Sequence, residues 1–527
     1  MKRVILTALS IGLMPVLGYG QLPPLNAAEG TWMMHHGAAS LRGLQRLRGA
    51  ITGPYVKCYN FFGTAEGDPI VADINGDGLN EIVMAAYDHG RVYAFRGTDC
   101  SLLWSSPILS SSPYGSFSPA VGELDPTRTG LEIAVTVDNT NRLYVLSGTD
   151  GSIIWSAPLG DVFWNPPAIA DIDGDGIGEI FVTSMFTTYA FRGNGTLLWS
   201  YPAGYNFSNV AVGDLGNDGT LEVVFVGRIS SSAAWRVFAL RATDGTFVWS
   251  YNIPNRGDVA LADLDNDGQL EVVVVYEGGG VIALRYNGTL YWSRTFSCTA
   301  PDNINSPTIA DLNEDGLREI VIGCYNQSTV YALRGTDGST LWSYSNVRTI
   351  AQSSSRKIGD IDGDGDLEVV LTSYVSPHLI VLDGVTGTVK WTWNNTAGVG
   401  FEGLAIADVD NDGCMEIVVG PNSTTAGSTF YVLDSPTPVS GCGVVGGDEE
   451  LKVEEDRNIG GVYLLVSPVK GGVNVETGRK AFVEIYTPDG RKVKGLEVDR
   501  SAFIELNKGA YIFRVKGHNL YRTVIVR

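Results

Sequence analysis

Six short loops of the chain carry oxygen-bearing side chains at one common spacing. Positions 1, 3 and 5 are Asp or Asn, position 6 is Gly, and position 9 is Glu. Ca²⁺ prefers six to eight oxygen ligands, which a short loop of alternating carboxylates can supply. Without a cation the clustered carboxylates would repel one another. The spacing therefore predicts about six Ca²⁺ sites. The predicted ligands are Asp73, Asn75, Asp77 and Glu81; Asp171, Asp173, Asp175 and Glu179; Asp263, Asp265, Asp267 and Glu271; Asp311, Asn313, Asp315 and Glu319; Asp360, Asp362, Asp364 and Glu368; and Asp408, Asp410, Asp412 and Glu416.

Two related loops are poorer in oxygen ligands. One keeps Asp214, Asp218 and Glu222, but Gly216 removes the oxygen at position 3, so we expect at most a weak seventh site there. The other spreads Glu123, Asp125 and Glu132 over a longer loop, and we expect weak or absent binding. Mg²⁺ suits these loops less well than Ca²⁺, because it retains water and demands a strict octahedron.

The acidic loops mark an internal repeat. Eight units begin at residues 73, 123, 171, 214, 263, 311, 360 and 408, so that successive loops lie 43 to 50 residues apart. Each unit contains four β-rich runs separated by Gly, Asp and Asn turns, which is typical of a propeller blade. The sequence therefore predicts an all-β fold, with an eight-bladed β-propeller over residues 55–440. Seven units end in a Trp strand, and we expect these tryptophans to pack between blades rather than bind carbohydrate.

The eighth unit lacks this Trp, and the segment 56–62 resembles an outer strand without a preceding partner. We therefore expect the N-terminal strand to complete the last blade, which removes an exposed sheet edge. The six cysteines suggest disulfides, with 15 possible connectivities. Three pairings are hypotheses: Cys58–Cys442 as a latch on the ring, Cys100–Cys414, and Cys298–Cys324.

The loops and strands together resemble FG-GAP (VCBS-type) repeats, the calcium-binding blades of integrin α-chain propellers and many bacterial surface proteins. The resemblance covers roughly residues 55–435 and implies the fold and the metal, but not a ligand. The run from Ile380 to Trp391 also looks like the Trp-docking repeat of pyrroloquinoline quinone dehydrogenases. The adjacent cysteines that such enzymes place over their cofactor are absent here.

Both ends of the chain carry segments of another character. Lys2 and Arg3 precede an apolar run, so residues 1–20 read as a signal peptide, followed by a lead-in segment, 21–54. Residues 441–457 read as a linker, and 458–527 as a small antiparallel β-sandwich. The runs 467–471, 485–493 and 509–515 resemble the type A sorting domain of type IX secretion, which implies export and surface attachment or release. An ordinary accessory β domain is the alternative.

No constellation of catalytic residues stands out, and we predict no catalytic or cofactor-binding residues and no enzyme activity. The net charge of −21 argues against nucleic acid as a partner. After signal cleavage no integral membrane segment is expected. The predicted function is a secreted or cell-surface adhesion, binding or scaffold module for an extracellular glycan or protein. The alternatives are a calcium-dependent polysaccharide lyase, as in rhamnogalacturonan lyases on eight-bladed propellers, and a self-associating structural protein.

Overall fold

The chain divides into two compact units, Met1–Asp448 and Glu449–Arg527. This computed structural model describes residues 44–436, Cys442 and the strands between 464 and 526. Within 44–436 the undescribed residues are 62, 64–66, 87, 111–117, 162–165, 206–207, 297–306, 325–328, 346–355, 374–375, 395–400 and 422–428. The proposed signal peptide, and the linker apart from Cys442, therefore lie outside the described residues. No helix of membrane-spanning length and hydrophobicity occurs among the residues that the structure describes.

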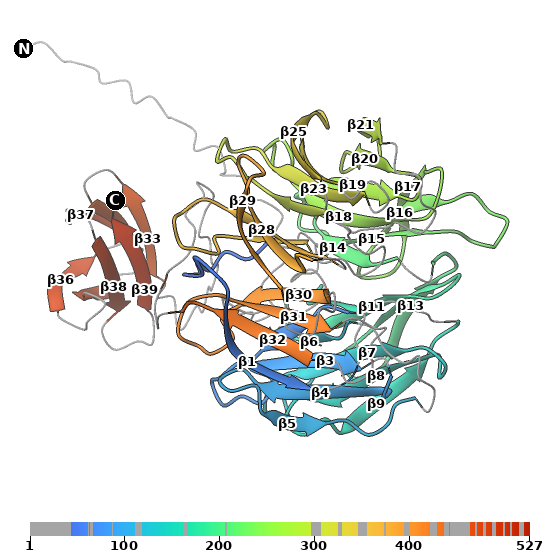
Figure 1. Ribbon diagram of the computed structural model, residues 1–527, viewed down its shortest axis with the longest axis horizontal. Coiled ribbons are helices and arrows are strands. Elements are labelled where there is room, and N and C mark those ends of the chain that lie inside the picture. Colours follow the sequence, from blue (N-terminus) through green and yellow to red (C-terminus); the bar gives the residue numbers. More distant parts are fainter. Residues whose placement is uncertain are drawn as a thin grey trace, which may run out of the picture. The chain divides into compact units, whose positions relative to one another are not determined.

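The first unit consists of eight four-stranded antiparallel sheets, which confirms the predicted eight-bladed propeller (Figure 1). Each blade runs from an inner to an outer strand. Blades 1 to 4 are β2 (Ile70–Ala72), β3 (Glu81–Ala86), β4 (Arg91–Arg96), β5 (Leu102–Ser105); β6 (Ala120–Gly122), β7 (Glu132–Val137), β8 (Arg142–Ser147), β9 (Ile153–Pro158); β10 (Ala168–Ala170), β11 (Glu179–Thr183), β12 (Thr188–Phe191), β13 (Leu197–Tyr201); and β14 (Val210–Gly213), β15 (Glu222–Gly227), β16 (Arg236–Arg241), β17 (Phe247–Asn252).

The remaining blades follow the same order of strands. Blades 5 to 8 are β18 (Gly257–Ala262), β19 (Glu271–Tyr276), β20 (Gly280–Leu284), β21 (Leu290–Thr295); β22 (Thr308–Ala310), β23 (Glu319–Cys324), β24 (Thr329–Arg334), β25 (Thr340–Ser345); β26 (Arg356–Gly359), β27 (Glu368–Thr372), β28 (Leu379–Asp383), β29 (Val389–Trp393); and β30 (Phe401–Ala407), β31 (Glu416–Pro421), β32 (Thr429–Asp434), closed by β1 (Tyr55–Phe61).

The burial of the strands explains their composition. Inner strands such as β2 and second strands such as β3 are buried along their whole length, so both faces need apolar or small residues. Runs of β-branched residues such as Glu271–Tyr276 satisfy that need. Outer strands mix buried and exposed positions, and β5 buries Trp104 between the half-buried Leu103 and the exposed Ser105. The core therefore lies between the blades.

The tryptophans of blades 1 to 6 make one repeated contact with the next blade. The indole N–H donates to a backbone carbonyl of the following third-to-fourth-strand hairpin at 2.6–2.8 Å. The indole ring lies against a glycine with positive φ two or three residues further on, as Trp199 does against Gly245. A Cβ at Gly245 would lie 2.7 Å from the ring. The predicted packing of these tryptophans between blades is confirmed.

The N-terminal strand completes the last blade, as predicted. Strand β1 pairs antiparallel with β32 from Tyr55 opposite Asp434 to Phe61 opposite Thr429 (Figure 1). The preceding residues 44–51 also belong to the propeller, because backbone bonds join Gln45 to Ile358 and Ile51 to Ile361. Trp391 of blade 7 donates to the Ile51 carbonyl, so this segment takes the place of the hairpin that blade 8 lacks. The lead-in therefore contributes to the junction between blades 7 and 8.

Two predicted disulfide pairings are wrong. The structure joins Cys58 to Cys100 and Cys414 to Cys442. Cys58 lies opposite Val432, in the register that Trp104 occupies opposite Ala94 in blade 1, so it faces the hairpin of the next blade. Cys442 returns to the acidic loop of its own blade, where its N–H donates to the Gly413 carbonyl. Cys298, of the third predicted pairing, lies outside the described residues.

The second unit contains seven described strands in two antiparallel sheets. One sheet has the order β33-β34-β37, and the other has the order β36-β35-β38-β39. The strands are β33 (Leu464–Val469), β34 (Gly472–Thr477), β35 (Ala481–Tyr486), β36 (Lys492–Val498), β37 (Ser501–Glu505), β38 (Gly509–Val515) and β39 (Tyr521–Val526). The side chains of Val483 and Ile485 are buried. That the sheets form a sandwich remains a prediction.

Candidate metal centres

Each acidic loop joins the inner strand of a blade to its second strand. In blade 1, Asp73 directly follows β2, and Glu81 is the first residue of β3. Strand pairing sets Glu81 opposite Ala72, the last residue of β2, so both ends of the loop are fixed by the sheet. The same register sets Glu416 opposite Ala407 in blade 8. The fold thus places the side chains of positions 1 and 9 side by side.

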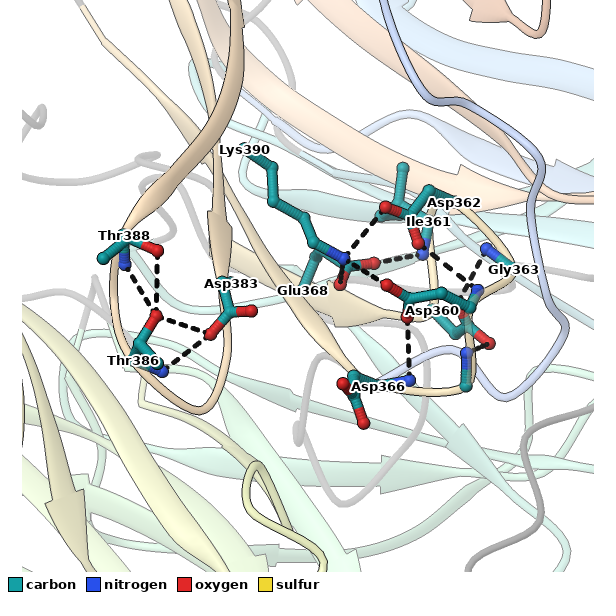
Figure 2. A network of polar contacts seen from close by, with 12 residues as sticks. Asp360, Ile361, Asp362, Gly363, Asp366, Glu368, Asp383, Thr386, Thr388 and Lys390 are labelled. Atoms are coloured by element: carbon teal, nitrogen blue, oxygen red, sulfur yellow. Dashed lines mark hydrogen bonds and ion pairs between the residues drawn. The ribbon is translucent and has the colours of Figure 1, made fainter.

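Backbone donors hold both oxygens of the position-1 Asp in most loops and one oxygen of the position-9 Glu. In blade 7 the N–H groups of Gly363 and Gly365 donate to Asp360 at 2.8 and 3.0 Å, and the N–H of Ile361 donates to Glu368 at 2.7 Å (Figure 2). Equivalent bonds recur in the other five predicted metal loops; in blade 1, Gly78 donates to Asp73 and Ile74 to Glu81. The second oxygen of the position-9 Glu has no hydrogen-bond partner in blade 8, whereas in blades 1, 5, 6 and 7 it contacts the side chain of Asn75, Arg285, Asn313 or Lys390.

Carboxylate oxygens converge in the four loops that have Asp at position 3. One ligand atom from each of three residues lies within 4.8 Å of the others in every cluster, a spacing that suits a single cation. The clusters are Asp171, Asp173 and Glu179; Asp263, Asp265 and Glu271; Asp360, Asp362 and Glu368; and Asp408, Asp410 and Glu416. The loops of blades 1 and 6 have Asn75 and Asn313 at position 3. There the amide NH₂ donates to the position-9 Glu at 3.0 and 3.4 Å.

The position-9 glutamates are electrostatically costly without a cation. Burial, followed by repulsion from neighbouring aspartates, raises the pKa of Glu81 to about 7 and that of Glu416 to about 9. Buried oxygens of Asp265, Asp408 and Glu416 also have no hydrogen-bond partner. An uncompensated buried carboxylate oxygen is unfavourable, and a hard cation satisfies it. The residues of these loops thus fit Ca²⁺.

The two poorer loops differ as the sequence indicates. In blade 4, Asp214 and Glu222 keep their backbone bonds to Gly219 and Leu215, but no side chain stands at position 3. In blade 2, Asp125 instead accepts hydrogen bonds from the side chains of Thr127 and Arg128 within the longer loop. Blade 2 therefore lacks the convergent side chains of the other loops, and blade 4 retains an incomplete set.

Basic side chains that reach into three of the loops escaped the sequence analysis. Lys390 bonds three carboxylates of the blade 7 loop, Lys57 contacts Asp410 in blade 8, and Arg285 lies 2.6 Å from Asp265 in blade 5. In blade 3, the nearest pair is Arg192 with Asp173 at 3.9 Å. A signal was available: Lys57 and Lys390 each precede the Cys or Trp of an outer strand, where six blades have uncharged residues.

Comparison with known proteins supports the repeat and the fold. Residues 263–322, 311–371 and 360–419 match the FG-GAP-like repeat, each match spanning two successive acidic loops. The chain thus contains FG-GAP-like repeats on an eight-bladed propeller. A search of curated protein sequences found no match.

Solved structures with a similar fold have diverse functions. A quinohemoprotein alcohol dehydrogenase, ADHIIG from Pseudomonas putida HK5, is 12% identical with a TM-score of 0.58, over 82% of this chain and 84% of that one. The V. cholerae biofilm matrix protein Bap1 is 16% identical with a TM-score of 0.51, over 78% and 92%. Saccharomyces cerevisiae Sqt1 is 11% identical with a TM-score of 0.53, over 73% and 100%. At such identities the likeness concerns the fold, and no specific enzyme function is indicated.

Proposed function

We propose that this β-propeller repeat protein binds Ca²⁺ in its acidic loops and acts outside the cell as an adhesion or scaffold module. The observation that carries the proposal is the convergence of three carboxylates within 4.8 Å in four equivalent loops. Blades 1 and 6 offer the same loop with an asparagine at position 3. The repetition of one oxygen-rich geometry around the ring favours a structural cation over isolated surface charges.

Ca²⁺ in these loops would stiffen the junctions between blades. The loops touch the following blade directly: the Leu131 N–H donates to the Ile74 carbonyl, and the Asn80 side chain donates to the Asp408 carbonyl. A ligand that binds only the folded state stabilises that state, by about 2.7 kcal/mol per site at one hundred times its dissociation constant. A rigid propeller then presents its variable loops for binding.

An extracellular location agrees with three features of the chain. Residues 1–20 have the pattern of a signal peptide, and residues 458–527 resemble a sorting domain for type IX secretion. Two disulfides connect four of the six cysteines, and disulfides persist in oxidising compartments. The proposed partner is an extracellular glycan, an extracellular protein or a second copy of the chain.

Thermal unfolding in Ca²⁺ and in chelator tests the metal. We expect a higher melting temperature with Ca²⁺, restored after chelation by adding Ca²⁺ back; equal melting temperatures would contradict metal binding. Asp171→Asn combined with Glu179→Gln should reduce the response by one site. As a control, Asp150→Asn changes a carboxylate in a hairpin outside the acidic loops and should leave the response unchanged.

A glycan array probed in Ca²⁺ and in chelator tests the adhesion role. Calcium-dependent retention of intact glycans would support a binding module and name its ligand class. Release of unsaturated oligosaccharides would instead show a polysaccharide lyase. Retention of no glycan, together with concentration-dependent assembly in sedimentation, would favour self-association.

A further inference from the structure

In blade 7 a lysine stands where a metal ion would bind. Lys390 Nζ lies 2.9 Å from Asp362, 2.8 Å from Asp364 and 2.7 Å from Glu368 (Figure 2). These residues are positions 3, 5 and 9 of the loop. The carboxylate at position 1, Asp360, pairs with Arg48 at 3.1 Å. All four predicted ligands of this loop thus already have a cationic partner.

Blade 8 repeats the arrangement from the other end of the chain. Lys57 of β1 contacts Asp410 at position 3 and lies 3.0 Å from Asp434. Lys57 directly precedes Cys58, and Lys390 directly precedes Trp391. Cys58 and Trp391 hold the same register, opposite Val432 and Val381. The two lysines therefore occupy equivalent positions in the outer strands of adjacent blades.

A second substitution accompanies each lysine. The third strands of blades 7 and 8 end in Asp383 and Asp434, whereas the same position is Arg in blades 1, 3, 4, 5 and 6. The residue before the outer-strand Trp is Leu in blades 1, 3 and 6, namely Leu103, Leu198 and Leu341. Blades 7 and 8 have thus lost the basic residue of the third strand and gained one in the fourth.

An ammonium group and an amide affect a metal loop differently. Lys has three donors and no acceptor, so it satisfies carboxylates without ever becoming a metal ligand. Asn75 and Asn313 also point NH₂ groups at their glutamates, but half a turn of the amide presents an oxygen instead. Among the described residues no ion pair joins Arg96 or Arg334 to the loops of blades 1 and 6. Those two loops are open to a cation.

We propose that Lys390 is a built-in substitute for the divalent cation of blade 7, and that Lys57 competes with the cation in blade 8. The loops of blades 1, 3 and 6 then hold Ca²⁺ more tightly than these two. The inference rests on the proposed calcium binding and makes it unequal around the ring. The last two blades, which close the propeller, carry their own positive charge and depend less on external metal than blades 1, 3 and 6.

Reciprocal exchange at the equivalent outer-strand position tests this proposal. Lys390→Leu installs the residue found in blades 1, 3 and 6, and Leu341→Lys gives blade 6 the lysine of blade 7. Calorimetric titration of the metal-stripped full chain with Ca²⁺ measures the number of tightly bound ions. We expect Lys390→Leu to add one ion per chain and Leu341→Lys to remove one. Lys494→Ala, an exposed lysine of β36, controls for charge loss and should change nothing.

The outcomes separate the two proposals. A wild-type chain that binds no Ca²⁺ contradicts the proposed function itself. A wild-type chain that binds Ca²⁺ equally in all six loops, with no gain in Lys390→Leu, leaves the proposed function standing and overturns the substitution by lysine. If Leu341→Lys fails to fold, Lys390→Leu alone decides, because leucine is accommodated at this position in three other blades.

Discussion

The outer strand of a blade packs against the next blade in two ways. Six junctions, from blades 1–2 to blades 6–7, use a tryptophan, and the junction between blades 8 and 1 uses a disulfide. At each of the six, a Trp of the outer strand contacts a glycine of the next hairpin, as Trp199 contacts Gly245. Between blades 8 and 1, Cys58 takes the register of the Trp. Cys100 takes the place of the glycine, with a φ of 60°. A covalent bond there replaces an aromatic contact.

The difference reflects how each outer strand is held. In blades 1 to 7 a hairpin connects the outer strand to its own blade, whereas β1 is joined to β32 only through pairing. The Cys58–Cys100 disulfide ties β1 to blade 1 and so keeps it at the junction, but it does not link the two ends of the ring. A disulfide between Cys58 and Cys442 would have done so. Closure of the ring thus depends on the β1–β32 hydrogen bonds.

The largest expected effect comes from removing a tryptophan at an ordinary junction. Trp199→Ala should destabilise the propeller by about 3–5 kcal/mol, because it leaves a cavity and removes the 2.7 Å bond to Ala242. Trp391→Ala should cost less, since Trp391 is less buried and its bond to Ile51 measures 3.2 Å. Chemical denaturation of both variants gives the two free energies. Equal losses would contradict the ranking of these junctions.

Removing the disulfide at the β1 junction should lower the free energy of unfolding somewhat less than Trp199→Ala does. Cys58→Ser combined with Cys100→Ser is expected to lower the free energy of unfolding by roughly 2–4 kcal/mol, because the unfolded chain regains the entropy of a closed loop. Reductant, which also opens Cys414–Cys442, should lower the free energy of unfolding of the wild type by at least as much. Denaturation curves that do not respond to either change would show that β1 is held by pairing alone.

Rebuilding the ordinary contact at this junction is a sharper test. Cys58→Trp combined with Cys100→Gly restores both partners in their registers, and the Gly97 carbonyl matches the Gly148 carbonyl that Trp104 uses. We expect this variant to be more stable than the double Ser variant by about 1–2 kcal/mol, the scale of a buried hydrogen bond and its packing. Reductant should lower its stability less than that of the wild type, because this variant has no Cys58–Cys100 bond to lose. A variant no better than the double Ser form would show that β1 leaves no room for an indole.

Substituting two glycines with positive φ distinguishes the effect of the Trp contact on stability from the effect of backbone strain. Gly245→Ala brings a methyl 2.7 Å from Trp199, whereas Gly219→Ala, at a similar φ of 83°, has nothing within 4 Å. Both variants strain the backbone by about 1 kcal/mol, so their difference measures the Trp contact. We expect Gly245→Ala to be the less stable by about 1 kcal/mol or more. Equal melting temperatures would contradict a tight fit under the ring.

The smallest expected effect is the pH dependence of stability that the acidic loops produce. It differs between the loop of blade 8, beside β1, and the loop of blade 1. Burial and nearby aspartates raise the pKa of Glu416 to about 9 and of Glu81 to about 7. A raised carboxyl pKa means that the folded state binds more protons than the unfolded one, so stability in chelator falls as pH rises above about 4.5. Above pH 7 the remaining slope should come from Glu416 together with Glu271 and Glu368, whose pKa values burial raises to about 8.

Melting temperatures of Glu416→Gln and Glu81→Gln between pH 5 and 8, in chelator, check this expectation. Glu416→Gln should flatten the profile above pH 7 by up to about 1 kcal/mol. Glu81→Gln should act mainly below that pH. Ca²⁺ should reduce the pH dependence in the wild type, with least effect on the part that Glu416 contributes, because Lys57 competes with the cation in blade 8. A Glu416→Gln profile as steep as that of the wild type would contradict the higher pKa at this junction.

The repeat made most of the fold predictable. Eight acidic loops and seven tryptophans recur at near-constant spacing, and spacing determines the blade. Closure by the N-terminal strand followed from the missing Trp of the last unit. The cysteine partners did not follow, because they depend on the register of β1 against β32. Aligning Cys100 with Gly151 in the repeated hairpin turn would have revealed the correct pairing.

The clustering of the loop carboxylates could be predicted because the residues that carry them lie within nine residues of one another. The cations could not, because Lys390 reaches its loop from a strand 22 to 28 residues away and Arg48 comes from the opposite end of the propeller sequence. The packing of residues 44–51 against the propeller could not be predicted either, because their partners Ile358, Ile361 and Ile406 lie more than 300 residues later in the chain. Local sequence patterns specify the acidic loops, and long-range contacts specify which basic side chains pair with them.

The segment 44–51 also determines the order of events as the protein forms. Gln45 bonds a residue 361 positions later, and Trp391 bonds one 340 positions earlier. Contacts of such separation form late, because the chain must first pay the entropy of a large loop. The first part of the propeller to leave the ribosome is therefore among the last to find its place. Until blades 7 and 8 exist, the chain is an open row of blades.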